Sequence, residues 1–465
     1  MLTSFKEQVQ SRWFVILGLG RAGQTLSRAL LKAGAKVAAY EEDERVWNLL
    51  AVRMLVKSGL IRLRKLGSRV VSVKPAVIAS PGFSAEHPAV RFFMGKGISV
   101  QDELDFATQF LKGEVIAVTG TNGKSTTVTM IGEILRQAGK KVFVGGNLAP
   151  GKPLSSALNA GGKDFYVVEV SSFQLSRSDW LAPKVAVLLN VTADHLDRHR
   201  SFADYARCKA RIFERQKPDD WAVLNYDDPV VRELAGAVRA RRLFFSLQRR
   251  TDSYLFRKWV YFQGKRMVPV DMIIERMTGR GLPAARLFRL EHLPVVENAV
   301  AAVSVAGALG VESQAVHAGL RCWQPLKHRL EFVRAINGIY FFNNSMCTNP
   351  QAGIRSLRAW RNKVVLIAGG KEKDADPAEF VKAMSERAKW VVLLGENSER
   401  LAAGLSRLSF HQYEIAYTMK DAVFKAFRQA TPGDVVLLSP GFASFDLFRN
   451  FQARGRAFKN AVWSL

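Results

Sequence analysis

The stretch Val115–Thr127, VIAVTGTNGKSTT, places the tightest constraint on how this chain folds. Its apolar start, Val115–Val118, is typical of a buried parallel strand. The residues that follow it, Val128–Ala138, have the apolar spacing of a helix. A glycine-rich turn between a strand and a helix presents backbone N–H groups and a helix N-terminus to an anion. We therefore expect a phosphate-binding loop at this turn.

The loop has the spacing Gly-x-x-Gly-Lys-Ser, which is shorter than the general phosphate-binding loop. Lys124 is expected to reach the outer phosphates of a nucleotide, and the hydroxyl of Ser125 or Thr126 to bind Mg²⁺. The alternative is an ordinary glycine-rich turn with a solvated lysine, which does not account for the order of strand, turn and helix. The residues expected to bind the nucleotide here are Gly120, Thr121, Asn122, Gly123, Lys124, Ser125 and Thr126.

A single acid, Glu169, interrupts the apolar strand predicted within Asp164–Ser172, DFYVVEVSS. A buried carboxylate is costly unless it is paired or binds a metal ion. A strand that follows a phosphate-binding loop in the next βαβ step is placed to supply a Mg²⁺ ligand. The alternative is an acid at a strand edge that faces water.

The next predicted strand, Val185–Asn190, leads into VTADHLDRH, in which His195 stands between two aspartates. His195 is a candidate metal ligand or phosphate contact, although a lone histidine is as often structural. A helix is predicted over Ser201–Glu214 with Lys209 in its middle. A lysine on a helix is normally solvated, and the residue pattern alone does not single out Lys209.

The N-terminal residues carry a second nucleotide pattern. A predicted strand, Phe14–Leu17, runs into Gly18-x-Gly20-x-x-Gly23, and a second strand, Lys36–Tyr40, ends in acidic residues. This is the dinucleotide fingerprint, in which an acid about 20 residues after the glycines binds a ribose hydroxyl. Because any nucleotide diphosphate meets the same requirements, the pattern does not indicate a nicotinamide. The alternative is a tight turn with a structural role only.

The last third of the chain alternates predicted strands and helices, which indicates a doubly wound parallel sheet. Ligand-binding residues of such sheets lie at the carboxyl ends of the strands. The predicted strands are Ile339–Asn343, Val364–Ala368, Trp390–Leu394 and Asp434–Leu438, and the residues at their ends include Ser345, Thr348, Lys373 and Ser444. The stretch Arg239–Leu290 is basic and rich in β-formers, and its pattern is too weak to interpret.

Composition limits the class of protein. The 465 residues are too many for one core, so two to four domains are expected. The three cysteines have no paired spacing, and the N-terminus has no leader-like apolar stretch, so a cytoplasmic protein is expected. The net charge of +27 could attract nucleic acid or anionic lipid. We favour a solvated basic surface, because no nucleic-acid motif accompanies the basic clusters Arg62–Arg69 and Arg239–Lys258.

Several motifs together resemble the Mur ligase family, the ATP-dependent amide-forming enzymes of peptidoglycan precursor synthesis. They include GLGRAG, ASPGFSAEHP, TGTNGKST, EVSSFQL, NVTADHLDRH, HRLEFV, GGKEKDAD and SPGFASFDLFRNFQARGRAF, and they span nearly the whole chain. The resemblance implies an α/β fold with three domains. These are a Rossmann-like UDP-sugar domain at 1–104, a central P-loop-type ATP-binding domain with a mixed sheet at 105–326, and a Rossmann-like, doubly wound amino-acid domain at 327–465.

The resemblance also implies the reaction and its ligands. A substrate carboxylate attacks the γ-phosphate of ATP, and an amine then attacks the resulting acyl phosphate to form an amide. The implied ligands are ATP, two Mg²⁺ ions, UDP-N-acetylmuramoyl-L-alanine and an amino acid, with D-glutamate favoured. A monomer is expected, nucleic acid is not an expected partner, and the positive charge leaves peripheral contact with an anionic membrane as a further hypothesis.

Site residues are implied position by position. Lys124, His195 and Lys209 are the catalytic candidates, with Ser125 and Glu169 at the first Mg²⁺, His195 at the second and Lys209 as a carbamylated metal ligand. ATP is further expected to contact Asn298, Arg329 and Asn344. The UDP-sugar is expected at Gly20, Arg21, Ala22, Glu41, Glu42, Asn147, Ser171 and Gln174. The amino acid is expected at Thr348, Lys373, Ser444, Phe445 and Phe451.

The chain departs from the family pattern near the acceptor. The loop usually reads Asp-Ser-Lys-Ala-Thr-Asn, whereas here Asn344 and Met346 replace its aspartate and lysine. Glu297 and Ala301 stand where histidine and asparagine are usual. Because Met346 cannot pair with a carboxylate, a ligase with L-glutamate or another acceptor is the alternative. A nicotinamide dehydrogenase or a nucleic-acid-dependent ATPase would leave most of these motifs unexplained.

Overall fold

The computed structural model describes residues 4–80, 82–148, 151–195, 198–279, 282, 284–371 and 376–465. Lys373, expected at the amino-acid site, therefore lies outside the described residues. Contacts divide the chain into two compact units. Unit 1 comprises Met1–Val191, Arg198–Phe244 and Val305–Val311, and unit 2 comprises Thr192–Asp197, Phe245–Ser304 and Glu312–Leu465. The predicted domain boundaries at 104/105 and 326/327 stay predictions.

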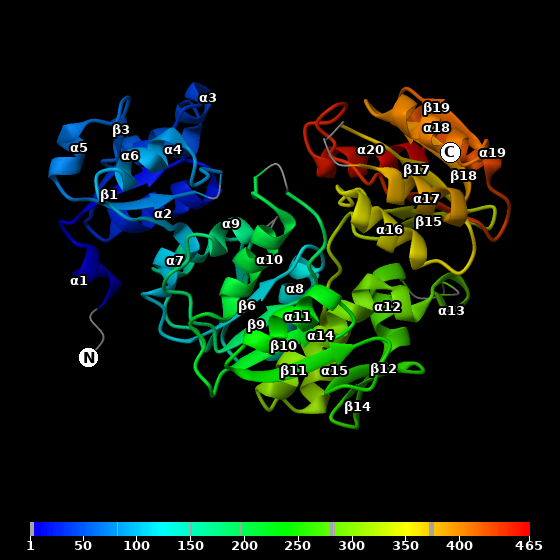
Figure 1. The fold of residues 1–465 in the computed structure, drawn as a ribbon, viewed down its shortest axis with the longest axis horizontal. Helices are drawn as coiled ribbons and strands as arrows, with labels where there is room; N and C mark the ends of the chain where they lie inside the picture. The colour runs from blue at the N-terminus through cyan, green and yellow to red at the C-terminus, as the bar shows by residue number, and fades with distance from the viewer. Residues whose placement is uncertain are drawn as a thin grey trace. The chain divides into compact units, whose positions relative to one another are not determined.

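Unit 1 begins with a five-stranded parallel sheet in the order β3-β2-β1-β4-β5, drawn in blue in Figure 1. Its strands are β1 (Trp13–Leu17), β2 (Lys36–Tyr40), β3 (Ile61–Leu63), β4 (Ala76–Ala79) and β5 (Val100–Asp102). Its helices are α1 (Phe5–Val9), α2 (Arg21–Lys32), α3 (Glu44–Trp47), α4 (Leu50–Lys57), α5 (Ser68–Ser72), α6 (Pro88–Met94) and α7 (Glu103–Thr108).

The sequence of strand β1 is a continuous apolar run because both faces of the strand are buried. Phe14 and Ile16 pack into one buried cluster, while Val15 and Leu17 pack into another, so both faces of the strand are covered. Gly23, after β1, is required by space: a Cβ on it would lie 1.9 Å from the carbonyl oxygen of Gly18. Gly18 itself has a φ of 90°, which favours glycine. The turn therefore brings α2 close to the end of β1.

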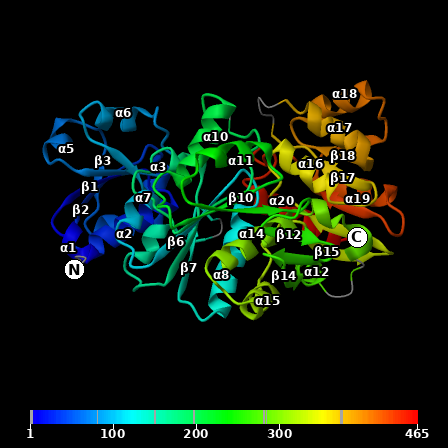
Figure 2. The same cartoon turned by 60° about the horizontal axis from the view of Figure 1, so that its bottom comes forward.

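The central sheet is mixed, as the sequence predicts, with the order β14-β13-β12-β11-β10-β9-β6-β8-β7. The strands from β7 to β10 are parallel, and α8 packs on β7 and β8 (Figure 2). In unit 1 this part holds β6 (Glu114–Thr119), α8 (Lys124–Gln137), β7 (Val142–Gly146), η1 (Leu154–Ala157), β8 (Phe165–Glu169), α9 (Ser172–Leu175), β9 (Val185–Leu188), α10 (Phe202–Ala210), η2 (Arg211–Phe213), β10 (Trp221–Asn225), α11 (Pro229–Leu234) and η3 (Ala235–Ala237); β11 (Arg241–Ser246) runs on into unit 2.

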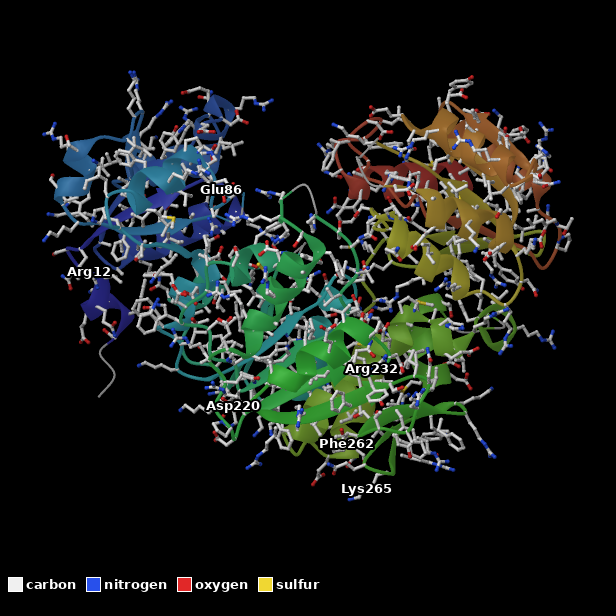
Figure 3. The ribbon with its side chains drawn as sticks, in the orientation of Figure 1. Arg12, Glu86, Asp220, Arg232, Phe262 and Lys265 are labelled. Atoms are coloured by element: carbon white, nitrogen blue, oxygen red, sulfur yellow. The ribbon has the colours of Figure 1, made fainter. Side chains whose placement is uncertain are left out.

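The basic stretch that the sequence left uninterpreted forms antiparallel hairpins in unit 2. Its strands are β12 (Ser253–Phe256), β13 (Trp259–Phe262) and β14 (Lys265–Pro269). Phe262 and Lys265 pair across a two-residue turn, as Figure 3 shows at the end of the hairpin. The turn residues Gln263 and Gly264 both have positive φ, at 46° and 79°, which is the backbone that a tight hairpin turn needs.

The last sheet of unit 2 has the order β15-β16-β20-β17-β18-β19. It is parallel except for the β15–β16 hairpin, which the sequence analysis did not predict, and β19 is also an addition to the predicted strands. The strands are β15 (Glu331–Ile336), β16 (Ile339–Asn343), β17 (Val364–Ala368), β18 (Ala388–Leu394), β19 (Tyr413–Ala416) and β20 (Val435–Leu438). The α/β fold with parallel-rich sheets is thus confirmed.

The helices of unit 2 surround these strands, and α14 also contributes its last turn to unit 1. They are α12 (Val270–Thr278), α13 (Ala284–Leu287), η4 (Leu290–His292), α14 (Pro294–Ala308), α15 (Ser313–Cys322), α16 (Pro350–Arg358), α17 (Ala378–Arg387), α18 (Ser398–Arg407), α19 (Met419–Gln429) and α20 (Phe451–Trp463). Among the described helices, none is both long and apolar enough to cross a bilayer.

Two buried acids at α7 hold unit 1 together. Asp105 is fully buried, and its carboxylate accepts hydrogen bonds from Ser178 Oγ (2.7 Å) and from three successive backbone N–H groups at 179–181 (3.0, 2.8 and 3.0 Å). Glu103 accepts one from the Ser155 N–H (2.6 Å), and burial raises the pKa of its carboxyl to about 7. The Asp105 bonds fasten the loop after α9 to α7.

We predict that Asp105→Ala lowers the free energy of unfolding by roughly 3 kcal/mol, because it leaves several buried donors unsatisfied. Urea unfolding followed by circular dichroism measures this change. Asp179→Ala is the matched control, since its carboxylate on the same loop is 66% exposed and pairs only with Arg211 among the ion pairs of the described residues. A loss no larger in Asp105→Ala than in the control would contradict the assignment.

The raised pKa of Glu103 predicts a pH dependence of stability. The folded state binds the proton of this carboxyl more tightly than the unfolded state, so its contribution is fully present below the ordinary glutamate pKa. That contribution is lost as pH rises toward about 7. As pH rises from 5 to 8, the natural protein should therefore lose stability that Glu103→Gln keeps. The difference in free energy of unfolding between the two proteins should change by on the order of 2 kcal/mol over this range.

Unfolding curves at the two pH values measure this change. The exposed Glu114→Gln should run parallel to the natural protein at both pH values. Parallel behaviour of Glu103→Gln as well would refute the prediction.

Candidate active site

The loop between β6 and α8 has the backbone of an anion cradle. Gly120 and Gly123 have φ of 149° and 92°, and a Cβ on Gly120 would lie 3.0 Å from Leu189 Cβ. Asn190, at the end of β9, holds the loop: its carbonyl accepts from the Thr121 N–H (2.9 Å) and its Oδ1 from the Asn122 N–H (2.8 Å). The glycines and the α8 N-terminus fit the phosphates of a nucleotide.

Two lysines converge on this loop from different helices. Lys124 Nζ donates to the carbonyl oxygens of Gly120 and Thr121, both at 2.9 Å. Lys209 Nζ, on α10, donates to the same Gly120 oxygen at 2.9 Å, and its side chain is only 2% exposed. Lys209 also lies 4.5 Å from the centre of the Tyr205 ring. Two cations at one carbonyl create a positive potential where phosphate would bind.

Glu169 lies beside the loop because β8 pairs with β6 in a register that sets Val118 opposite Glu169. Its buried carboxylate accepts a hydrogen bond from Ser125 Oγ at 2.6 Å, and the Asn147 side-chain amide lies 3.5 Å from its other oxygen. A hydroxyl and a carboxylate are the oxygen ligands that Mg²⁺ prefers. Ser125 and Glu169 therefore fit the first Mg²⁺ that the sequence analysis predicts at this loop, and the structure brings these two expected ligands together.

Seven of the eight residues expected at the UDP-sugar line one cavity of unit 1, which has a volume of about 480 Å³. The cavity is lined by Gly18, Gly20, Arg21, Ala22, Glu41, Glu42, Ser80, Gly82, Phe83, His87, Glu103, Gly146, Asn147, Pro153 and Gln174. Of the eight expected residues, only Ser171 is not among its lining, and it caps α9 in a reciprocal pair with Gln174. The structure thus brings together residues that lie up to 154 positions apart in sequence.

Two residues that line the cavity, Glu41 and Arg21, also form hydrogen bonds with the backbone. Glu41 accepts from the Leu19 N–H (2.8 Å) and the Asp43 N–H (3.0 Å), so both of its oxygens fix the turns at the strand ends. Arg21 donates to the carbonyl oxygen of Leu148 at 2.8 Å. These bonds set the orientation of an acid and a base on the cavity wall.

In unit 2 the loop that the sequence predicts near the acceptor is held by side-chain hydrogen bonds. Asn344 Oδ1 accepts from the Leu330 N–H (3.2 Å), and its amide nitrogen donates to Ser356 Oγ (3.1 Å) and Ser439 Oγ (3.3 Å). Asn344 was expected to contact ATP, and the structure shows its amide engaged in the protein. Glu297, on α14, forms an ion pair with Arg355 on α16.

Arg454 lies in the motif SPGFASFDLFRNFQARGRAF, and the sequence pattern does not predict a role for it. Its guanidinium is buried and donates to the Ser345 hydroxyl (3.2 Å) and to the carbonyl oxygens of Ser345 (3.0 Å), Phe442 (2.9 Å) and Ala443 (3.3 Å). Burial lowers its pKa to about 10. Arg454 thereby joins the loop after β16 to the loop after β20, where Ser444 lies.

His195 lies in unit 2 with a positive φ of 55° and a largely exposed side chain. Its neighbour Asp194 accepts a hydrogen bond from the side chain of Asn349 (3.0 Å), which follows Thr348. Unit 2 therefore brings the His195 and Thr348 segments together. The other expected residues of unit 2 vary in exposure: Asn298 and Ser444 are buried, Arg329, Thr348 and Phe451 are partly buried, and Phe445 is exposed.

This chain matches two protein-family domains and is similar to named enzymes along nearly its whole length. The Mur ligase middle domain matches residues 118–279, and the Mur ligase glutamate ligase domain matches residues 328–442. The UDP-N-acetylmuramoylalanine–D-glutamate ligase of Pelotomaculum thermopropionicum is 40% identical over 97% of both chains. The enzyme of the same name from Caldanaerobacter subterraneus subsp. tengcongensis is 37% identical over 98% of this chain and 99% of that protein.

Solved structures share the fold at lower identity. The MurF ligase of Thermotoga maritima in complex with ADP has a TM-score of 0.61 at 17% identity, covering 99% of this chain and 97% of that one. The UDP-N-acetylmuramate–alanine ligase MurC of the same organism has a TM-score of 0.59 at 17% identity, covering 97% and 99%. With two matching domains and relatives of at least 37% identity along nearly its whole length, the chain belongs to the Mur ligase family.

Proposed function

We propose that this protein is an ATP-dependent amide ligase that adds D-glutamate to UDP-N-acetylmuramoyl-L-alanine in cytoplasmic peptidoglycan precursor synthesis. The relatives described above carry that activity in their names. The observation that carries the proposal is the cluster at the β6–α8 loop, where Lys124 and Lys209 share the Gly120 carbonyl and Ser125 contacts Glu169. We also propose that the protein acts as a monomer without nucleic acid as a partner.

The reaction proceeds in two steps. An oxygen of the alanyl carboxylate bonds to the γ-phosphorus of ATP as the bond to ADP breaks, giving an acyl phosphate. The amine of the amino acid then attacks the acyl carbon, loses a proton and expels phosphate, leaving an amide. Lys124 and the backbone N–H groups of the loop orient and stabilise the phosphates. Ser125 and Glu169 would hold Mg²⁺, which supplies positive charge to the phosphate oxygens.

The remaining expected residues are assigned to the substrates. The 480 Å³ cavity would bind the UDP-sugar through the glycine turn at Gly20, with Arg21 and Asn147 near its phosphates. His195 would be a ligand of the second Mg²⁺, and Asn298, Arg329 and Asn344 would lie near ATP. Thr348, Lys373, Ser444, Phe445 and Phe451 would form the amino-acid pocket. These roles go with the domains at 1–104, 105–326 and 327–465.

The acceptor is the part of the proposal that the loop sequence challenges. Met346 carries no charge to pair with a side-chain carboxylate, and Asn344 is bonded within the protein. Phosphate release with ATP, Mg²⁺ and UDP-N-acetylmuramoyl-L-alanine should require D-glutamate. Phosphate release that requires L-glutamate instead would keep the mechanism and change the acceptor. If neither amino acid gives phosphate release, the proposed substrates are refuted.

We predict that Glu169→Gln lowers D-glutamate-dependent phosphate release by about 100-fold or more, because it removes a charged group that stabilises the transferring phosphate through Mg²⁺. Steady-state phosphate release at several Mg²⁺ concentrations measures the effect. The control is Glu114→Gln, at the exposed start of the same β6 strand, which should retain full activity. Unchanged release in Glu169→Gln would remove Glu169 from the site.

We further propose that Lys209 carries a carbamate. Its amine is buried beside the phosphate-binding loop, and a carbamate would supply anionic oxygen for a hard metal ion there. The Lys209 ammonium first releases one proton to solvent. The neutral amine nitrogen then bonds to the carbon of CO₂, an electron pair of one C=O bond moves to oxygen, and a second proton leaves from the nitrogen to solvent. The lysine thus changes from a cation to an anion.

The carbamate predicts a ¹³C resonance in protein equilibrated with ¹³C-bicarbonate. Lys209→Gln should lack this resonance and lose about 100-fold or more of the ligase activity. Lys124→Gln is the matched control: it should lose activity but keep the resonance, because its change spares the modified amine. An active natural protein without the resonance would show that Lys209 acts as an unmodified lysine.

A further inference from the structure

Residues 45–74 of unit 1 carry positive charge without any acid. Between Glu44 and Glu86 the chain has no aspartate or glutamate, whereas 45–74 contains eight cationic residues. They are Arg45, Arg53, Lys57, Arg62, Arg64, Lys65, Arg69 and Lys74. Arg45 pairs with Asp43 and Arg62 with Glu44, and the other six form no ion pair with any carboxylate in the described part of the chain.

The same segment exposes large apolar side chains. Six of the 17 exposed large apolar residues in the described part of the chain fall within these 30 positions. They are Leu49, Leu50, Met54, Val56, Ile61 and Val73. Contiguous apolar exposure marks an interaction site, whereas scattered single apolar residues are normal on the surface of a soluble protein. The arrangement of these residues in the fold therefore decides which of them can act together.

Helix α4 combines the two features on one face. Leu50, Arg53, Met54 and Lys57 are spaced i, i+3, i+4 and i+7, which places them on the same side of the helix. Leu50 and Met54 are 76% and 54% exposed, while the opposite side of the helix is buried through Val52 and Leu55. The exposed face is therefore not needed to attach α4 to its sheet.

The elements that follow α4 lie at the edge of the sheet and on its other face. Val52 and Leu55 of α4 pack into the cluster that contains Phe14 and Ile16. Leu63 of β3 and Val70 of α5 pack instead into the cluster that contains Val15 and Leu17.

The chain runs from α4 into β3, the edge strand of the five-stranded sheet, and on into α5, all within the blue part of the ribbon in Figure 1. Ile61 on β3 is exposed, and Arg64, Lys65 and Arg69 follow it. None of these residues lines the 480 Å³ cavity. We call the exposed face of α4, formed by Leu50, Arg53, Met54 and Lys57, the α4 surface.

We propose that the α4 surface docks this protein on an anionic lipid bilayer. Its aliphatic side chains would enter the interfacial region while its lysine and arginine contact the headgroup phosphates. The proposal goes beyond the ligase reaction and does not depend on the identity of the acceptor. It commits to lipid because clustered cations beside exposed aliphatic residues match both parts of such a membrane.

Two other occupants fit the surface less well. Nucleic acid would make use of the cations but not of Leu50 and Met54, since single strands stack on aromatic side chains and duplexes offer phosphates and base edges. A second copy of this chain could cover the aliphatic residues, but it would bring two clusters of the same charge together without an acid between them. Anionic lipid satisfies both the aliphatic and the cationic side chains.

Vesicle flotation of the full chain tests the proposal. The protein should float with vesicles of phosphatidylglycerol and phosphatidylcholine, and not with phosphatidylcholine alone. Leu50→Gln/Met54→Gln and Arg53→Gln/Lys57→Gln should each reduce flotation about tenfold. Both variants should keep ligand-dependent phosphate release, which shows that they fold. Rising salt should weaken flotation of the natural protein more than that of the charge variant.

Matched control variants come from exposed positions in unit 2. Tyr417→Gln/Phe424→Gln removes two exposed aromatic residues, and Arg407→Gln/Lys420→Gln removes two exposed cations. Neither should change flotation. The proposal is overturned by absence of flotation, by equal binding to neutral vesicles, or by control variants that lose as much as the α4 variants. Lipid-independent dimerisation that Leu50→Gln/Met54→Gln abolishes would also overturn it, in favour of a second copy.

Discussion

The carbonyl oxygen of Gly120 is the contact on which the nucleotide site depends. It accepts hydrogen bonds from Lys124 and from Lys209, which belong to different helices, so the position of this peptide fixes two charges at once. While Lys209 is unmodified, the two ammonium groups repel each other across one neutral acceptor. A phosphate in the loop, or the carbamate proposed for Lys209, would relieve that repulsion. Asn190 holds the loop from the neighbouring strand. The site is therefore built on backbone geometry more than on any single side chain.

The sequence was sufficient for the parts of the site that lie at the ends of regular strands. Glu169 could be placed near Ser125 because consecutive parallel strands end at the same edge, and the structure sets them 2.6 Å apart. The roles of Asn190 and Arg454 could not be predicted, because both residues form hydrogen bonds with backbone groups of segments that are distant in sequence. No local pattern records which carbonyl oxygens the fold brings to a buried arginine, and only the tertiary structure shows them.

The departures from the family pattern fall in residues that hold the structure of unit 2. Glu297 stands where histidine is usual, and its ion pair with Arg355 gives the acid a partner between α14 and α16. Asn344 replaces an aspartate and satisfies both ends of its amide with neighbouring backbone and hydroxyl groups. Met346 has no such compensation among the described residues. In the proposed acceptor pocket, the change to Met346 therefore removes a charge and adds no side-chain bond that replaces it.

The placement of charge in unit 1 makes its surface more positive than composition suggests. Asp102, Glu103 and Asp105 are buried at the start of α7, where they accept hydrogen bonds from backbone and side-chain donors. Acids in the interior contribute little to the field outside, while the cations of residues 45–74 remain at the surface. These three buried carboxylates therefore do not offset the cations of residues 45–74, of which only Arg45 and Arg62 pair with acids, Asp43 and Glu44, in the described part of the chain.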